Sequence, residues 1–177
     1  MSKLSIITVP NHILRQKAKK INPRDPFLRK IIPQMIDILR QEKGVGLAAP
    51  QVGISLRVIV IESQQKNTKI KIPSIPLMVL INPEIIKYSQ KITKAEEGCL
   101  SIPNIWGVVE RPHKVIVKAY NQENKLIKIK ATGFLARVIQ HEIDHLNGVL
   151  FTDKVDLNTL HKITPDGQKI KINPLFL

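Results

Sequence analysis

Four stretches of the chain combine β-branched and apolar residues in the way that is typical of β-strands. They span residues 58–61, 78–81, 115–120 and 126–130, and each is bounded by turn residues. In the last stretch apolar residues alternate with lysine, which predicts a half-exposed strand of an antiparallel sheet. Residues 64–76, between the first two stretches, are polar and contain two prolines, so we expect a surface loop there.

Apolar residues recur at helical spacing in two other segments. In the first, Asp25 and Pro26 predict the N-cap and first position of a helix over residues 27–43. Pro33 falls inside this pattern, so the helix either begins after Pro26 or is kinked. In the second, Thr132 predicts an N-cap and Gly148 a helix end. A helical turn over residues 13–18 is also expected.

The remaining segments carry weaker patterns. Residues 44–53 are small, apolar and glycine-rich, so they either form one wall of a cleft or, as the glycines alone favour, an ordinary loop. A phosphate-binding loop is excluded because no Gly-Lys-Ser/Thr follows. Residues 161–177 mix lysine, proline and glycine without a clear period, which predicts a loop or a loosely docked tail.

Length and composition predict one folded domain. The chain has 177 residues, of which 43% are hydrophobic, and this is enough to bury a substantial core in a single domain over residues 1–177. Its net charge of +14 indicates a negatively charged partner such as nucleic acid, an anionic membrane or the ribosome. A proteome rich in lysine and isoleucine explains the charge equally well, because the lysines are spread along the chain.

Cysteine use and the first residues indicate the compartment. Cys99 is the only cysteine, so an intramolecular disulfide is excluded. The first residues lack an apolar core of signal-peptide length, and no stretch is long and apolar enough to span a membrane. We therefore expect a soluble protein of a reducing compartment, the cytoplasm.

The second predicted helix contains the pattern H-E-x-x-H. Residues four apart lie on one face of a helix, so His141 and His145 can present two imidazoles to one metal ion with Glu142 beside them. Such a spacing also occurs by chance in long helices. The metal site is the stronger interpretation, because Glu142 and Asp144 flank the imidazoles on a helix that otherwise needs an apolar face.

A catalytic metal usually has three protein ligands and a water molecule, so a third ligand is needed. The pattern H-E-x-x-H-x-x-G-x-x-H fails because Phe151 occupies its last position, and no glutamate follows Glu142. The other candidates are His12, His113, His161 and Cys99. We favour Cys99, because a thiolate binds zinc or ferrous iron strongly, although an isolated cysteine is more often a small buried hydrophobe.

Three motifs together resemble those of the bacterial type of peptide deformylase. They are G-V-G-L-A-A-P-Q at 44–51, E-G-C-L-S at 97–101 and Q-H-E-I-D-H-L at 140–146, and the similarity extends to about Asp153. The resemblance implies an enzyme that removes the formyl group from the N-terminal formyl-methionine of nascent polypeptides and releases formate. We accordingly predict an α+β fold in which antiparallel β-sheets pack around the C-terminal H-E-x-x-H helix, with an additional N-terminal helix.

The resemblance also implies roles for individual residues. Fe²⁺ is the metal it implies, bound by Cys99, His141 and His145, with Zn²⁺, Ni²⁺ or Co²⁺ as substitutes. Glu142 is then the general base, and the Gln51 side chain and the Leu100 backbone N–H stabilise the oxyanion. The residues expected to bind substrate are Val45, Gly46 and Gly98 at its main chain, Phe134 and Val138 at the methionine pocket, and Trp106 at the cleft rim.

Two charged residues near the motifs leave alternatives open. Glu97 either pairs with Arg111 to fix the Cys99 loop or forms an ordinary surface ion pair with it. Arg137 either borders the methionine pocket or points to solvent.

Two other functions are compatible with part of the sequence. An H-E-x-x-H metallopeptidase shares the water chemistry, but Cys99 and Gln51 argue against it. An RNA- or ribosome-binding module with a structural metal would need a fourth protein ligand. The expected partners are nascent formyl-methionine polypeptides and the ribosome, with neither a membrane nor specific DNA binding.

Overall fold

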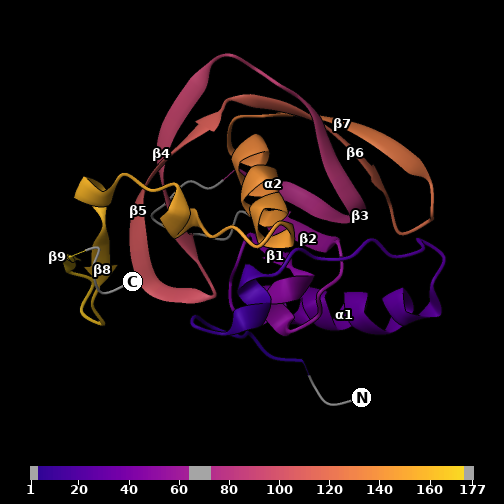
Figure 1. Ribbon diagram of the computed structural model, residues 1–177, viewed down its shortest axis with the longest axis horizontal. Helices are drawn as coiled ribbons and strands as arrows, with labels where there is room; N and C mark the ends of the chain where they lie inside the picture. Colours follow the sequence, from indigo (N-terminus) through magenta and orange to yellow (C-terminus); the bar gives the residue numbers. More distant parts are fainter. Residues whose placement is uncertain (1–3, 64–72, 174–177) are drawn as a thin grey trace.

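The computed structural model describes residues 4–63 and 73–173, which form two helices and two antiparallel sheets (Figure 1). The α-helices are α1 (Pro26–Gln41) and α2 (Gly133–Leu146). The strands are β1 (Gly46–Ala48), β2 (Val58–Ser63), β3 (Ile75–Tyr88), β4 (Ile92–Cys99), β5 (Ile102–Pro112), β6 (Lys114–Tyr120), β7 (Leu126–Thr132), β8 (His161–Ile163) and β9 (Lys169–Lys171). The predicted α+β fold is confirmed.

The larger sheet has the strand order β1-β2-β3-β6-β7, and every neighbouring pair is antiparallel. Its two faces are covered by different helices. Ile59, Ile61 and Val117 pack in the cluster that contains α2, whereas Val58 and Val60 pack in the cluster that contains α1. Burial on both faces explains why β2 reads as a continuous apolar run.

Helix α1 begins where the sequence predicts. The Asp25 side chain accepts a hydrogen bond from the Phe27 N–H at 2.9 Å, and Pro26 occupies the first turn, where it has no hydrogen bond to lose. The helix continues through Pro33 to Gln41, so the alternative of a later start is wrong. Its apolar stripe, including Ile31 and Met35, is buried against the larger sheet.

The smaller sheet has the order β4-β5-β8-β9 and was not predicted. Strands β4 and β5 form a hairpin whose turn is Leu100-Ser101, because Cys99 pairs with Ile102. The loop or loosely docked tail predicted over residues 161–177 is wrong for two short strands, since β8 pairs with β5 and β9 pairs with β8, while residues 174–177 lie outside the described residues. This sheet places Cys99 at the end of a strand rather than in a free loop.

Helix α2 lies at the centre of the molecule, with β4 and β5 on one side and the larger sheet on the other (Figure 1). Thr132 is its N-cap, as predicted. Gly148 follows the C-cap with φ of 74°, and a Cβ there would lie 2.5 Å from the Arg15 carbonyl oxygen. Only glycine accommodates both conditions, so the predicted helix end is confirmed.

Four predicted strands are confirmed as β2, β3, β6 and β7, although β3 is much longer than expected. Residues 64–72 of the predicted surface loop lie outside the described residues, and the strand begins at Ile75. The glycine-rich segment forms β1 and a 3₁₀ helix, Ala49–Val52, rather than an irregular loop. The turn predicted over 13–18 is a 3₁₀ helix at His12–Arg15. No helix among the described residues has the length and apolar character to cross a membrane.

Candidate metal centre

Helix α2 presents the two histidines of the H-E-x-x-H pattern on one face. His141 and His145 are both buried, and their ring centroids are 5.0 Å apart. They lie one helical turn apart, so the helix alone sets their spacing. The helix backbone thereby positions two of the three predicted ligands without help from a metal ion.

Cys99 joins the two histidines from the end of β4. Its Sγ is 3.1 Å from His145 Nε2, and the ligand atoms of Cys99, His141 and His145 all lie within 4.8 Å of one another. Metal bonds of about 2.0 Å to nitrogen and about 2.3 Å to sulfur separate tetrahedral donors by roughly 3.5 Å. The donor set and its spacing therefore fit a borderline-soft divalent metal with small side-chain shifts.

The other histidines lie elsewhere. His161 Nδ1 is 3.0 Å from the Thr159 carbonyl oxygen, and its Nε2 is 3.9 Å from Glu96. Neither His12 nor His113 belongs to the cluster formed by Cys99 and the α2 histidines. Of the candidates for the third ligand, the structure brings only Cys99 to this cluster in the described part of the chain.

Glu142 is buried beside this cluster. Its Oε2 has no hydrogen-bond partner among the described residues, and a Cβ on Gly46 would lie 2.3 Å from its Oε1. Gly46 is thus required for the close approach of β1 to the carboxyl group. Burial raises the pKa of Glu142 to about 7. A carboxyl group with this pKa can both accept and donate a proton at neutral pH.

The Gln51 side chain is held by the backbone of Ala48. The side-chain Oε1 accepts a hydrogen bond from the Ala48 N–H at 2.8 Å. This leaves the Nε2 donor directed toward the β4–β5 turn, 3.4 Å from Cys99 Sγ and 3.4 Å from Ser101 Oγ. A rigid, buried amide donor next to the Cys99 sulfur is suited to stabilising negative charge there.

The residues predicted to bind substrate lie on β1 and the residue before it, on β4, on β5 and on α2. Gly98 pairs with Trp106, and a Cβ on Gly98 would lie 2.7 Å from the indole ring. Trp106 itself is 38% exposed. Val45, Phe134 and Val138 belong to one apolar cluster with α2. Leu100 lies in the β4–β5 turn, and its Cδ1 would be 3.0 Å from a Cβ on Gly44.

Glu97 ties the metal cluster to three basic side chains. It binds Arg111 through two hydrogen bonds of 2.6 and 2.8 Å, Arg137 at 2.7 Å and His141 Nδ1 at 2.9 Å. Burial alone would raise the pKa of Glu97, but the hydrogen bonds from Arg111 and His141 outweigh it and hold this pKa well below its ordinary value. The ionised carboxylate thus orients the His141 ring.

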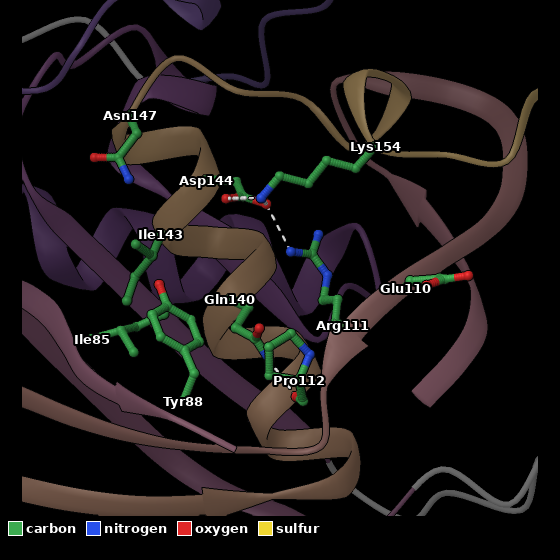
Figure 2. Close-up of a pocket in the computed structure, with 10 residues that line it drawn as sticks. All are labelled: Ile85, Tyr88, Glu110, Arg111, Pro112, Gln140, Ile143, Asp144, Asn147 and Lys154. Carbon is green, nitrogen blue, oxygen red and sulfur yellow. Dashed lines mark hydrogen bonds and ion pairs between the residues drawn. The ribbon is translucent and has the colours of Figure 1, made fainter. Parts of the chain in front are cut away.

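The network continues to the surface on another face of α2. Arg111 donates to Asp144 at 2.7 Å, and Lys154 donates to both Asp144 oxygens. Arg111, Asp144 and Lys154 line a pocket of about 140 Å³ together with Tyr88 and Gln140. Figure 2 shows these side chains and the contacts of Asp144. None of the three candidate metal ligands lines this pocket.

Comparisons with known proteins point to one family. The family profile described as polypeptide deformylase matches residues 3–161. The peptide deformylase of Desulforudis audaxviator is 43% identical over 162 residues, covering 92% of this chain and 98% of the relative. The chain belongs to the peptide deformylase family. The relative from Microchaete diplosiphon is 50% identical over 147 residues, covering 82% of this chain and 75% of its own.

Solved structures of the family share the fold. A peptide deformylase from Synechococcus elongatus in complex with actinonin matches with a TM-score of 0.79 and 42% identity, covering 86% of this chain and 80% of its own. A class I type b peptide deformylase from Acinetobacter baumannii with bound Met-Ala-Ser matches with a TM-score of 0.82 and 35% identity. The match covers 87% of this chain and 99% of the Acinetobacter chain. The predicted family and enzyme class are confirmed, and the metallopeptidase alternative is not favoured.

The structure bears on the alternatives left open for two charged residues, and the predicted pairing of Glu97 with Arg111 is confirmed. The Glu97–Arg111 pair is buried, so the alternative of a surface ion pair is wrong. The alternative that Arg137 points to solvent is wrong. This side chain is buried and donates to Glu97 and to the carbonyl oxygens of Val109 and Thr93. Its position one turn before His141 was the available signal, because the two residues share a helix face.

Replacing Arg111 by methionine is expected to lower the free energy of unfolding by about 3–5 kcal/mol, because it leaves Glu97 and Asp144 partly uncompensated inside the protein. Chemical denaturation of both proteins measures the difference. Lys94→Met is the matched control, since it removes an exposed pair with Glu110 and should leave unfolding almost unchanged. Equal, small losses in the two variants would contradict the importance of the buried network.

Proposed function

We propose that this chain, as one catalytic domain over residues 1–177, removes the formyl group from the N-terminal formyl-methionine of nascent polypeptides and releases formate. Cys99, His141 and His145 would hold the catalytic metal. The observation that carries the proposal is that a thiol from β4 and two imidazoles from α2 meet in one cluster, and that the residue after His141 is a buried glutamate with an unpartnered oxygen among the described residues.

We propose Fe²⁺ as the metal, with Zn²⁺, Ni²⁺ or Co²⁺ able to replace it. One thiolate and two imidazoles suit all four ions, and three protein ligands leave a position for water. When bound, the metal supplies Lewis acidity that lowers the pKa of a coordinated water toward neutrality. Elemental analysis of protein purified without oxygen tests the choice, and zinc as the dominant metal would contradict it.

Glu142 would carry the proton in this reaction. Its Oε2 is free of other hydrogen bonds among the described residues, so it can accept a proton from the attacking water and deliver it to the leaving amine. The pKa of about 7 supports both steps, because neither protonation state is strongly disfavoured at neutral pH. The contact with Gly46 limits where the carboxyl group can move.

Gln51 and Leu100 would stabilise the oxyanion. The Gln51 amide donor is already held beside Cys99, which avoids the cost of ordering it during the reaction. Leu100 follows Cys99 in the tight β4–β5 turn, so its backbone N–H is placed by the same hairpin that places the thiol. The two donors would come from different elements, Gln51 from the 3₁₀ helix after β1 and Leu100 from the β4–β5 turn.

The formylated peptide would bind as an additional strand. β1 is an edge strand of the larger sheet and β4 is an edge strand of the smaller one, so both offer free main-chain groups. Val45, Gly46 and Gly98 would bind the peptide main chain. Phe134 and Val138 would receive the methionine side chain, and Trp106 would contact later residues. The Met-Ala-Ser named for the Acinetobacter structure begins with methionine, as this proposal requires.

The proposed place of action is the cytoplasm beside the ribosome, where formylated chains emerge. A formate-release assay with formyl-Met-Ala-Ser tests the activity directly. We expect formate to be released, to cease after treatment with a chelator, and to return after addition of Fe²⁺ or Ni²⁺. Casein is the matched substrate for an endopeptidase. Casein cleavage without formate release would overturn the proposal.

A further inference from the structure

Part of the larger sheet is left uncovered on the face that α1 packs against. Tyr120 lies on that face of β6 and packs in the α1 cluster. Because side chains alternate along a strand, Lys114 and Lys118 share the face of Tyr120, and the register places Lys128 and Lys130 of β7 beside them. All four are exposed. We call these four residues the lysine face.

The lysine face concentrates like charges on two neighbouring strands. Lys118 lies directly opposite Lys128, and like charges in this position destabilise a sheet. Within the described part of the chain, none of the four lysines forms an ion pair. On β3, Glu84 lies opposite Lys118 and attracts it, but the ion pair of Glu84 is with Lys20, and the other three lysines have no such neighbour in the strand register. An external anion would offset this repulsion.

We propose that the lysine face binds the phosphate backbone of structured RNA. The inference rests on the proposed function, because a deformylase that works on nascent chains works beside ribosomal RNA. Lysine supplies point charges that contact phosphates, whereas reading bases relies on the planar groups of arginine or amides. The four residues include neither, so the contact is independent of sequence and sensitive to salt.

The position of this face allows RNA and peptide to bind together. The opposite face of β6 and β7, with Val117 and Ala131, packs in the cluster of α2. The lysines therefore point away from the helix that carries His141 and Glu142. In Figure 1, β6 and β7 lie on the opposite side of α2 from β4 and β5, which carry Cys99 and Trp106.

The test measures binding of a labelled RNA hairpin to the full chain over a range of salt concentrations. In Lys118→Gln/Lys128→Gln we expect affinity at about 0.1 M salt to fall about tenfold or more, and the slope of log affinity against log salt to decrease by about 2. The matched control is Lys162→Gln/Lys171→Gln, which removes the same charge from exposed positions on β8 and β9. It should bind RNA almost as well as the parent.

Two further measurements make the result decisive. Formate release from free formyl-Met-Ala-Ser and the melting temperature should not fall in the Lys118→Gln/Lys128→Gln variant. These two results would show that the loss of RNA binding is not caused by unfolding or by a damaged active site. Equal weakening in both double variants would overturn the proposal in favour of net charge alone. It would also be overturned if the β6–β7 variant lost binding to vesicles of one-third phosphatidylglycerol but kept its RNA affinity.

Discussion

Replacing Glu142 by glutamine will reduce formate release from formyl-Met-Ala-Ser by about 10²- to 10⁴-fold while the protein keeps its metal. Glutamine preserves the shape of the side chain beside Gly46 but cannot accept the proton of the attacking water. Because burial already raises the pKa of Glu142 to about 7, a neutral amide is well tolerated there, and the melting temperature should not fall. Steady-state kinetics and elemental analysis measure the two effects.

The matched control for this substitution is Glu42→Gln. Glu42 is the exposed C-cap residue of α1, remote from the cluster on α2, and its replacement removes the same charge. We expect full activity and full metal content. If Glu142→Gln retained the activity of this control, Glu142 would lose its role as the proton carrier. If it lost its metal as well, the fall in activity would be a failure of the site rather than of the base.

The sequence identifies most of the proposed site because its chemistry depends on local spacing. His141, Glu142 and His145 are placed by one helical turn, and the sequence alone shows that turn. Cys99 emerges from the need for a third ligand. Gln51 required the family resemblance, because nothing in a small-residue run indicates that its side-chain oxygen is held by the Ala48 N–H.

The charged network behind the site could not be predicted in the same way. Arg137 shares a helix face with His141, yet its direction is decided by Glu97, which lies 40 residues away in sequence on β4. Asp144 likewise reads as a surface residue of α2 until Arg111 of β5 is brought beside it. Such pairs depend on tertiary contacts that no periodicity encodes, and they are informative because a buried charge is costly unless paired.

The smaller sheet was missed for a related reason. Strand β4 carries three charged residues among its eight, and only one of its positions is buried, so it lacks an apolar alternation. Strand β5 contains proline and glycine, which usually indicate a turn between elements. Here Gly107 instead allows a close approach, because a Cβ on it would lie 2.4 Å from the Val155 side chain. Strands β8 and β9 have three residues each, too few for any pattern. Pairing between strands, rather than local propensity, determines this part of the fold.

Replacing Cys99 by serine will lower metal affinity by more than about 100-fold, and formate release will fall with it. Loss of groups that merely orient metal ligands costs about 10- to 100-fold in affinity, and Cys99 would supply a ligand itself. Serine has nearly the same size but stays protonated at neutral pH, so it offers no anionic donor to the ion. Competition with a fluorescent chelator measures the affinity, and circular dichroism checks the fold.

Cys99→Asp separates the loss of a ligand from the loss of a sulfur atom. Aspartate restores an anionic donor at the end of β4, so it should recover part of the metal affinity that serine loses, with a preference shifted toward ions that favour oxygen ligands. A purely packing role for Cys99 predicts the reverse, because a carboxylate fits worse than a hydroxyl beside the buried Gln51 and Ser101. Unchanged metal content and activity in Cys99→Ser would remove Cys99 from the ligand set altogether.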